Sequence, residues 1–206
     1  MNAIAHSGHV ALVTAMLAAG TLCAGACRVS AATVDGTASV DGRPAINAVV
    51  YLERPGVAPT NPPPTAGRVV MDQKNLSFRP EVLPVTRGTV IEFTNSDDVQ
   101  HNVFSPSAIA GKFNLGTYGP GAIRTVNLDE VGDVRVLCNI HMEMEAHILV
   151  LAGPYFATVQ DGSFQIPDVP AGTYTLKLWQ EQWLPFTRSI EVPESGHLTV
   201  NVNAAK

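Results

Sequence analysis

Residues 138–144 read Cys-Asn-Ile-His-Met-Glu-Met and lie between two short runs, 134–137 and 148–151, that are typical of β-strands. Cys138, His141 and Met144 therefore place a thiolate, an imidazole and a thioether close together, in one loop between two expected strands. Such a loop can wrap around a metal ion. This stretch predicts a metal site at the end of a β-structure.

A second imidazole is available upstream at His101, just after an expected strand that ends at Asn95. One cysteine, two histidines and a weak, distant methionine form the ligand set that selects copper for electron transfer. The thiol must lose its proton to bind, and an adjacent cation enforces that loss. Zinc stays open as an alternative, because one cysteine and two histidines also suit a structural zinc site.

Four further side chains near the loop are candidates for the axial ligand or for a supporting role. Met144 is the expected axial ligand, because the third position after the loop histidine can come round beneath the metal, whereas Met142 would have to fold back over its own backbone. His147 is expected to be a strand residue, and it is the first alternative if Met144 does not bind. Asn102 is the candidate for tying the two ligand loops together, since such partners commonly orient metal ligands.

Working outward from this loop, the chain reads as an all-β protein. Short runs alternate apolar and polar residues between turns rich in Gly, Pro, Asn and Asp, and no convincing helical period follows the N-terminal region. The clearest expected strands are 90–93, 134–137, 148–151, 174–179 and 198–202.

The middle of the chain, residues 67–152, resembles the plastocyanin, pseudoazurin and amicyanin branch of the cupredoxins. The residues that carry the resemblance are Phe78, Pro80, Val85, Gly88, Val90, Phe93, Asn95, Asp97, His101, Asn102 and the C-x2-H-x2-M loop from Cys138. The loop spacing is most similar to amicyanin, although Ile140 stands where the family often has proline. The resemblance implies a Greek-key sandwich with one type 1 copper, bound by His101, Cys138, His141 and Met144.

The regions that flank the middle resemble a second family. Residues 161–166 and 169–176 are similar to the carboxypeptidase-regulatory-like, or transthyretin-like, β-sandwich, in which such a segment is preceded by one like 34–52 here. That earlier segment contains an Asp41-Gly42 turn, which predicts a hairpin. We therefore expect the cupredoxin sandwich to be inserted into a loop of this small sandwich. An independent N-terminal hairpin on a single extended domain is the alternative.

The expected division of the chain follows from these patterns and from a Pro-rich stretch that is best read as a stiff connector. It consists of a signal peptide (1–32), the first part of the small sandwich (33–54), the linker (55–66), the cupredoxin domain (67–152) and the second part of the small sandwich (153–206).

The N-terminal region predicts export. An Ala-rich apolar run at 10–24 is followed by small residues up to Ala32, which is typical of a signal peptide. The run is shorter than the ~20 apolar residues of a spanning helix, so no transmembrane span is expected in the mature protein. We expect a periplasmic or secreted protein, with a lipid anchor through Cys27 as the minor alternative.

Composition narrows the function further. A net charge of −5 without a basic cluster argues against nucleic-acid binding. Cleavage would leave Cys138 as the lone cysteine, a liability in an oxidising compartment unless a metal occupies it. The sequence has no His-x-His pair for further copper ions and no Ser-His-Asp pattern. We therefore do not expect this protein to be an enzyme.

These observations predict an exported blue-copper protein that acts as a one-electron carrier or redox module. Its expected partner is a dehydrogenase, oxidase or cytochrome, and the amicyanin-like loop suggests methylamine utilisation as one context. The alternative is a structural or binding protein of the envelope, with stored copper or structural zinc and no electron transfer.

Overall fold

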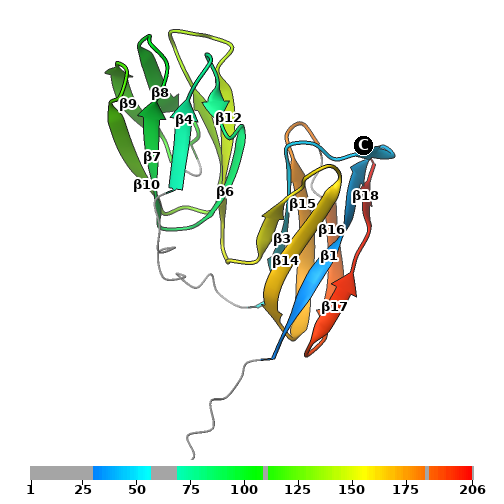
Figure 1. Ribbon diagram of the computed structural model, residues 1–206. Coiled ribbons are helices and arrows are strands. Elements are labelled where there is room, and N and C mark those ends of the chain that lie inside the picture. Colours follow the sequence, from blue (N-terminus) through cyan, green and yellow to red (C-terminus); the bar gives the residue numbers. More distant parts are fainter. Residues whose placement is uncertain (1–29, 57–68, 109–110, 184–185, 206) are drawn as a thin grey trace, which may run out of the picture.

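The computed structural model describes residues 30–56, 69–108, 111–183 and 186–205, which form two β-sandwiches side by side (Figure 1). The predicted all-β fold class is confirmed. None of these residues lies in a helix that is long and apolar enough to cross a membrane. Most of the predicted signal peptide, including Cys27, and most of the predicted linker lie outside the described residues.

The first sandwich consists of nine described strands in two sheets, ordered β10-β7-β4-β5 and β6-β12-β11-β8-β9. Its strands are β4 (Val69–Gln73), β5 (Phe78–Arg79), β6 (Val82–Thr86), β7 (Thr89–Asn95), β8 (His101–Ser105), β9 (Phe113–Tyr118), β10 (Ile123–Leu128), β11 (Gly132–Leu137) and β12 (Glu145–Leu151). Most neighbours are antiparallel, whereas β4 with β7 and β6 with β12 are parallel. Alternate residues of β7 point inward, so Ile91 and Phe93 are buried while Val90 is exposed.

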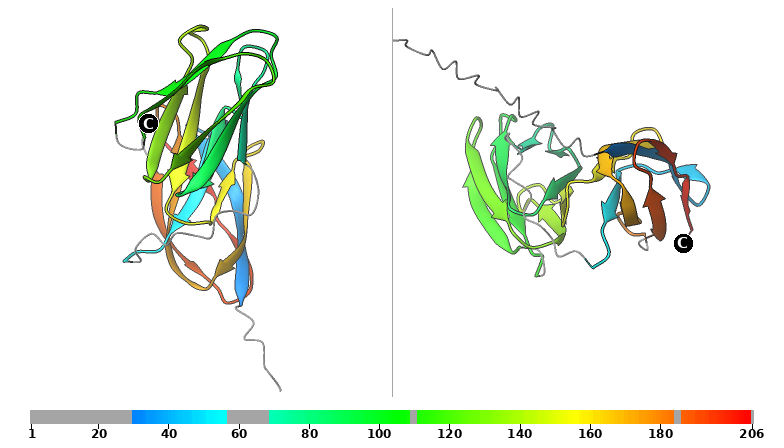
Figure 2. Two further views of the ribbon diagram at one scale, coloured as in Figure 1. Left: turned by 90° about the vertical axis from the view of Figure 1, so that its left-hand side faces the viewer. Right: turned by 90° about the horizontal axis from the view of Figure 1, so that it is seen from below.

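The second sandwich is built from both ends of the described chain. Its strands are β1 (Ala31–Val40), β2 (Arg43–Pro44), β3 (Ala48–Glu53), β13 (Phe156–Thr158), β14 (Ser163–Pro170), β15 (Gly172–Gln180), β16 (Phe186–Val192), β17 (Gly196–Thr199) and β18 (Val202–Ala204). Strand β1 pairs with β2, β14, β17 and β18, while β3 pairs with β13 and β15. Figure 2 shows the same two groups of strands from two further sides. That one domain is inserted into the other stays a prediction.

The predicted hairpin turn is present, but its second strand is short. Asp41 and Gly42 both adopt positive φ, as a tight hairpin between β1 and β2 requires. Only Arg43 and Pro44 pair back onto β1. The chain then crosses to the opposite sheet, where β3 lies beside β15, so β3 does not extend the hairpin.

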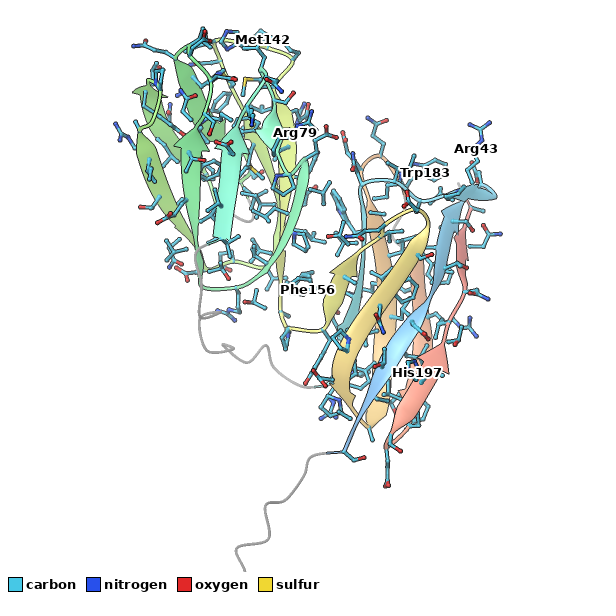
Figure 3. All side chains as sticks on the ribbon, in the orientation of Figure 1. Arg43, Arg79, Met142, Phe156, Trp183 and His197 are labelled. Atoms are coloured by element: carbon cyan, nitrogen blue, oxygen red, sulfur yellow. The ribbon has the colours of Figure 1, made fainter. Side chains whose placement is uncertain are left out.

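Strand β12 is buried on both faces, and this position joins the two sandwiches. Its residues Ala146, Ile148 and Val150 point into the core of the first sandwich. Leu149 and Leu151 point the other way and pack in a separate cluster with Val49 and Val82, against which Tyr51, Phe156 and Trp179 also lie. We call this cluster the joint, and Figure 3 labels Phe156 within it. Covering both faces explains why this strand lacks apolar and polar alternation.

Candidate metal centre

The topology brings the two predicted ligand loops to one end of the first sandwich. His101 is the first residue of β8, and Cys138 follows the last residue of β11. These two strands are antiparallel, with Phe104 opposite Leu137. The start of β8 therefore lies next to the loop that leaves β11. That loop carries Cys138, His141 and Met144 and returns into β12.

Three of the four predicted ligands meet in the structure. Nδ1 of His101 and Nδ1 of His141 lie 3.1 Å apart. One donor atom each from His101, Cys138 and His141 all lie within 4.8 Å of one another. His101 and Cys138 are buried, whereas His141 is partly exposed. Two imidazole nitrogens that face each other beside a buried sulfur form a donor set that fits one small, soft metal ion such as copper.

Asp97 orients His101, a role that the sequence analysis did not assign. Its Oδ2 lies 2.9 Å from Nε2 of His101. Burial alone would raise the pKa of Asp97, but the backbone N–H of Leu76, His101 and the backbone N–H of Asn75 outweigh it and hold the pKa below its ordinary value. An ionised Asp97 accepts a hydrogen bond from Nε2–H of His101, which leaves the Nδ1 lone pair of His101 free for a metal. The only sequence feature that could have indicated this role is the position of Asp97, four residues before His101.

Hydrogen bonds between residues of the loop hold Cys138 in place. The backbone N–H of Cys138 donates to the carbonyl of Met144 over 3.3 Å, and the N–H of Met144 donates to the carbonyl of His141 over 3.1 Å. The N–H of Ile140 donates to Sγ of Cys138 over 3.4 Å. An amide that points at the sulfur favours the thiolate, which is the form that binds metals.

The two candidate axial methionines have opposite environments. Met144 is 1% exposed and belongs to the core of the first sandwich. Met142 is 82% exposed and lies at the outer tip of the loop (Figure 3). The burial of Met144 is compatible with the predicted axial role, which stays a prediction.

The contacts of the Asn102 and His147 side chains are with residues outside the two ligand loops. The side-chain amide of Asn102 donates to Oδ1 of Asn114 on β9, over 3.0 Å. Its own Oδ1 is buried without a hydrogen-bond partner among the described residues, so its link to the second ligand loop stays a prediction. His147 contacts Asp133 and Trp179 instead, on the side of β12 that faces the joint.

Solved structures of cupredoxins are similar to part of this chain. A reduced amicyanin variant is 19% identical, with a TM-score of 0.39, over 49% of this chain and 99% of that chain. A purple cupredoxin from Nitrosopumilus maritimus is 20% identical, with a TM-score of 0.35, over 41% and 98%. A copper-containing nitrite reductase from Thermus scotoductus SA-01 is 25% identical, with a TM-score of 0.39, over 46% of this chain but only 24% of its own length.

The sequence comparisons bear on the second sandwich. The family model described as polysaccharide lyase family 4, domain II, matches residues 151–200. The predicted carboxypeptidase-regulatory-like resemblance of this region is not confirmed. No curated protein matches the chain.

Proposed function

We propose that the protein binds one copper ion through His101, Cys138, His141 and Met144 and works as a one-electron carrier. The observation that carries this proposal is the approach of two imidazole Nδ1 atoms to 3.1 Å, beside the buried thiol of Cys138. Bound copper would supply a one-electron couple, which no side chain of the loop provides.

The surrounding residues are suited to such a centre. Asp97 fixes the ring and tautomer of His101 through its 2.9 Å contact. The hydrogen-bonded loop, tied to itself at Cys138 and Met144, needs little rearrangement when the charge at its centre changes. Ligands that are held before the metal binds lower the reorganisation that would otherwise slow electron transfer.

The partly exposed edge of the centre is the proposed route for the electron. His141 is partly exposed, and the exposed apolar side chains of Ile140 and Met142 flank it in the same loop. A redox protein that covers these side chains would come close to the imidazole of His141. We propose a dehydrogenase, oxidase or cytochrome as this partner, acting in the periplasm or outside the cell, and no enzymatic activity for this chain itself.

Optical spectroscopy tests the proposal. Cu(II) added to the mature protein should give one equivalent of an intensely coloured complex, because a copper thiolate absorbs visible light strongly. The near-isosteric Cys138→Ser variant should remain folded and lack this colour, and Met142→Leu should keep it. A colourless protein that takes up zinc instead would replace the proposal with the structural zinc alternative.

A further inference from the structure

A second cluster of possible ligands lies beside the apolar residues of the joint, on the face of β12 opposite the first centre. A cavity of about 400 Å³ opens there between the two sandwiches. It is lined from the first sandwich by Glu81, Glu145 and His147, and from the second by Asn47, Gln180 and Glu181. None of these six residues belongs to the copper centre proposed above.

His147 is the buried member of this cluster. Its side chain is 9% exposed, and its ring lies against Trp179 with the ring centroids 5.3 Å apart. Nδ1 lies 2.9 and 3.1 Å from the two carboxylate oxygens of Asp133. Nε2 is buried and has no hydrogen-bond partner among the described residues. A buried polar atom without a partner is destabilising, so a ligand at this nitrogen would stabilise the protein.

Two carboxylates surround that nitrogen. Oε1 of Glu145 and Oε1 of Glu181 each lie 3.7 Å from Nε2 of His147, too far for a hydrogen bond. One ligand atom from each of the three residues lies within 4.8 Å of the others. The four ligands of a tetrahedral zinc ion, at roughly 2.0–2.2 Å from it, lie about 3.3–3.6 Å from one another. Small side-chain movements would bring these three atoms to that spacing.

The charge at the cluster favours a cation. Asp133, Glu145 and Glu181 face His147, and the guanidinium of Arg135 donates to both carboxylate oxygens of Glu145, including the Oε1 that faces Nε2. Three carboxylates against one guanidinium leave an excess of negative charge around Nε2 of His147, and this excess would attract a metal ion.

We propose that Nε2 of His147 and the carboxylates of Glu145 and Glu181 bind a zinc ion at the joint. Asp133 accepts a hydrogen bond from Nδ1–H of His147, and this carboxylate–histidine arrangement commonly orients metal-bound imidazoles. Oε1 of Gln180 is buried without a hydrogen-bond partner among the described residues and lines the same cavity, so it or a water molecule would complete the coordination. Nitrogen and oxygen donors without a thiolate suit zinc, while the softer donors of the other centre suit copper.

Zinc in this position would clamp the two sandwiches together. Glu145 and His147 belong to β12, whereas Glu181 follows β15 of the second sandwich. Glu145 also follows Met144 directly, so the clamp would fix the end of the loop that carries the first centre. The inference does not rest on the proposed electron-carrier function, because the two centres share no ligand.

Zinc titration by calorimetry tests the proposal on the full mature protein, once with copper already added and once as Cys138→Ser. One equivalent of zinc should bind in both samples. Glu181→Gln, at a side chain that is 48% exposed and can change without loss of the fold, should weaken this binding more than about tenfold. His147→Gln should do the same, and Glu194→Gln, at an exposed carboxylate elsewhere on the second sandwich, should not.

Cobalt(II) provides a second readout. It should bind the Cys138→Ser protein with the weak visible bands of nitrogen and oxygen ligation, and Glu181→Gln should remove them. The proposal is overturned if Cys138→Ser takes up no zinc, or if Glu181→Gln and His147→Gln bind it as tightly as the parent protein. A wild-type protein that gives no intense colour with Cu(II) would contradict the proposed function. The zinc titration would still decide whether zinc binds at the joint.

Discussion

The structure contains two buried histidines that are built in the same way but turned in opposite directions. Asp97 contacts Nε2 of His101 and leaves Nδ1 facing a thiol and a second imidazole. Asp133 contacts Nδ1 of His147 and leaves Nε2 facing two carboxylates. A carboxylate thus selects which ring nitrogen is available in each case, and the atoms opposite that nitrogen differ: sulfur and nitrogen at His101, and carboxylate oxygens at His147.

Removing the first sandwich should have the largest effect, because this deletion takes away residues of both proposed metal sites. Joining the flanks by a short Gly/Ser linker in place of residues 66–152 should abolish copper binding and the zinc site, yet leave a folded β-sandwich. Loop closure depends only weakly on length, so the shortened connection should be tolerated. Circular dichroism and a cooperative thermal transition would check this. An unfolded product would instead favour a single fused core or a tandem arrangement.

Separate substitutions of His101 and His147 test whether only His101 binds copper. His101→Gly should lose the copper colour and regain it with added imidazole, because the small residue leaves a cavity at a ligand position. His147→Gly should keep the colour. Visible spectra with and without imidazole decide between them. An unchanged copper spectrum for His101→Gly would mean that the upstream ligand is wrongly assigned.

The joint should matter for stability rather than for colour. Leu149 is 4% exposed, so Leu149→Ala should lower the free energy of unfolding by about 2–5 kcal/mol through lost burial and a residual cavity. Ile46→Ala, a truncation of a side chain that is 70% exposed, should change it by no more than about 0.5 kcal/mol. Urea unfolding measures both. Equal effects of the two variants would argue against a packed joint.

The two aspartates should affect only their own centres. Asp97→Asn should weaken copper binding by about 10–100-fold, since an amide no longer enforces the tautomer of His101. Asp133→Asn should weaken zinc binding to a similar extent and leave copper affinity unchanged. Competition titrations against chelators of known affinity measure both constants. If each variant weakened both metals equally, a shared structural defect would be the better explanation.

The smallest expected effect concerns the axial position. Met144→Leu should raise the reduction potential by an amount on the order of 60 mV, the equivalent of a tenfold change in the relative affinity for the two copper oxidation states. We expect the more apolar site, which favours Cu(I), to outweigh the loss of the soft sulfur. Met142→Leu, at the exposed tip, should leave the potential nearly unchanged. Voltammetry that gave the reverse result would contradict both the Met144 assignment and the amicyanin-like interpretation of the loop.

Local patterns in the sequence predict what adjacent residues determine. The alternation located the strands now seen as β7 and β15, and the spacing of Cys138 and His141 identified a loop that meets His101. Alternation cannot show what covers an uninterrupted apolar strand, so the joint along β12 went unrecognised. Glu181 is distant in sequence from His147, and only the packing of the two sandwiches brings them together.

The placement of β12 should make its backbone amides the slowest in the protein to exchange with solvent. This strand is hydrogen-bonded to β6 on one edge and β11 on the other, and packed side chains cover both of its faces. Its backbone amides therefore have no local route to solvent, and their exchange with deuterium requires the unfolding of the sandwich around them. The slowest-exchanging amides should map along 146–151, so the most persistent part of the fold begins two residues beyond Met144, at the end of the loop that holds the proposed copper.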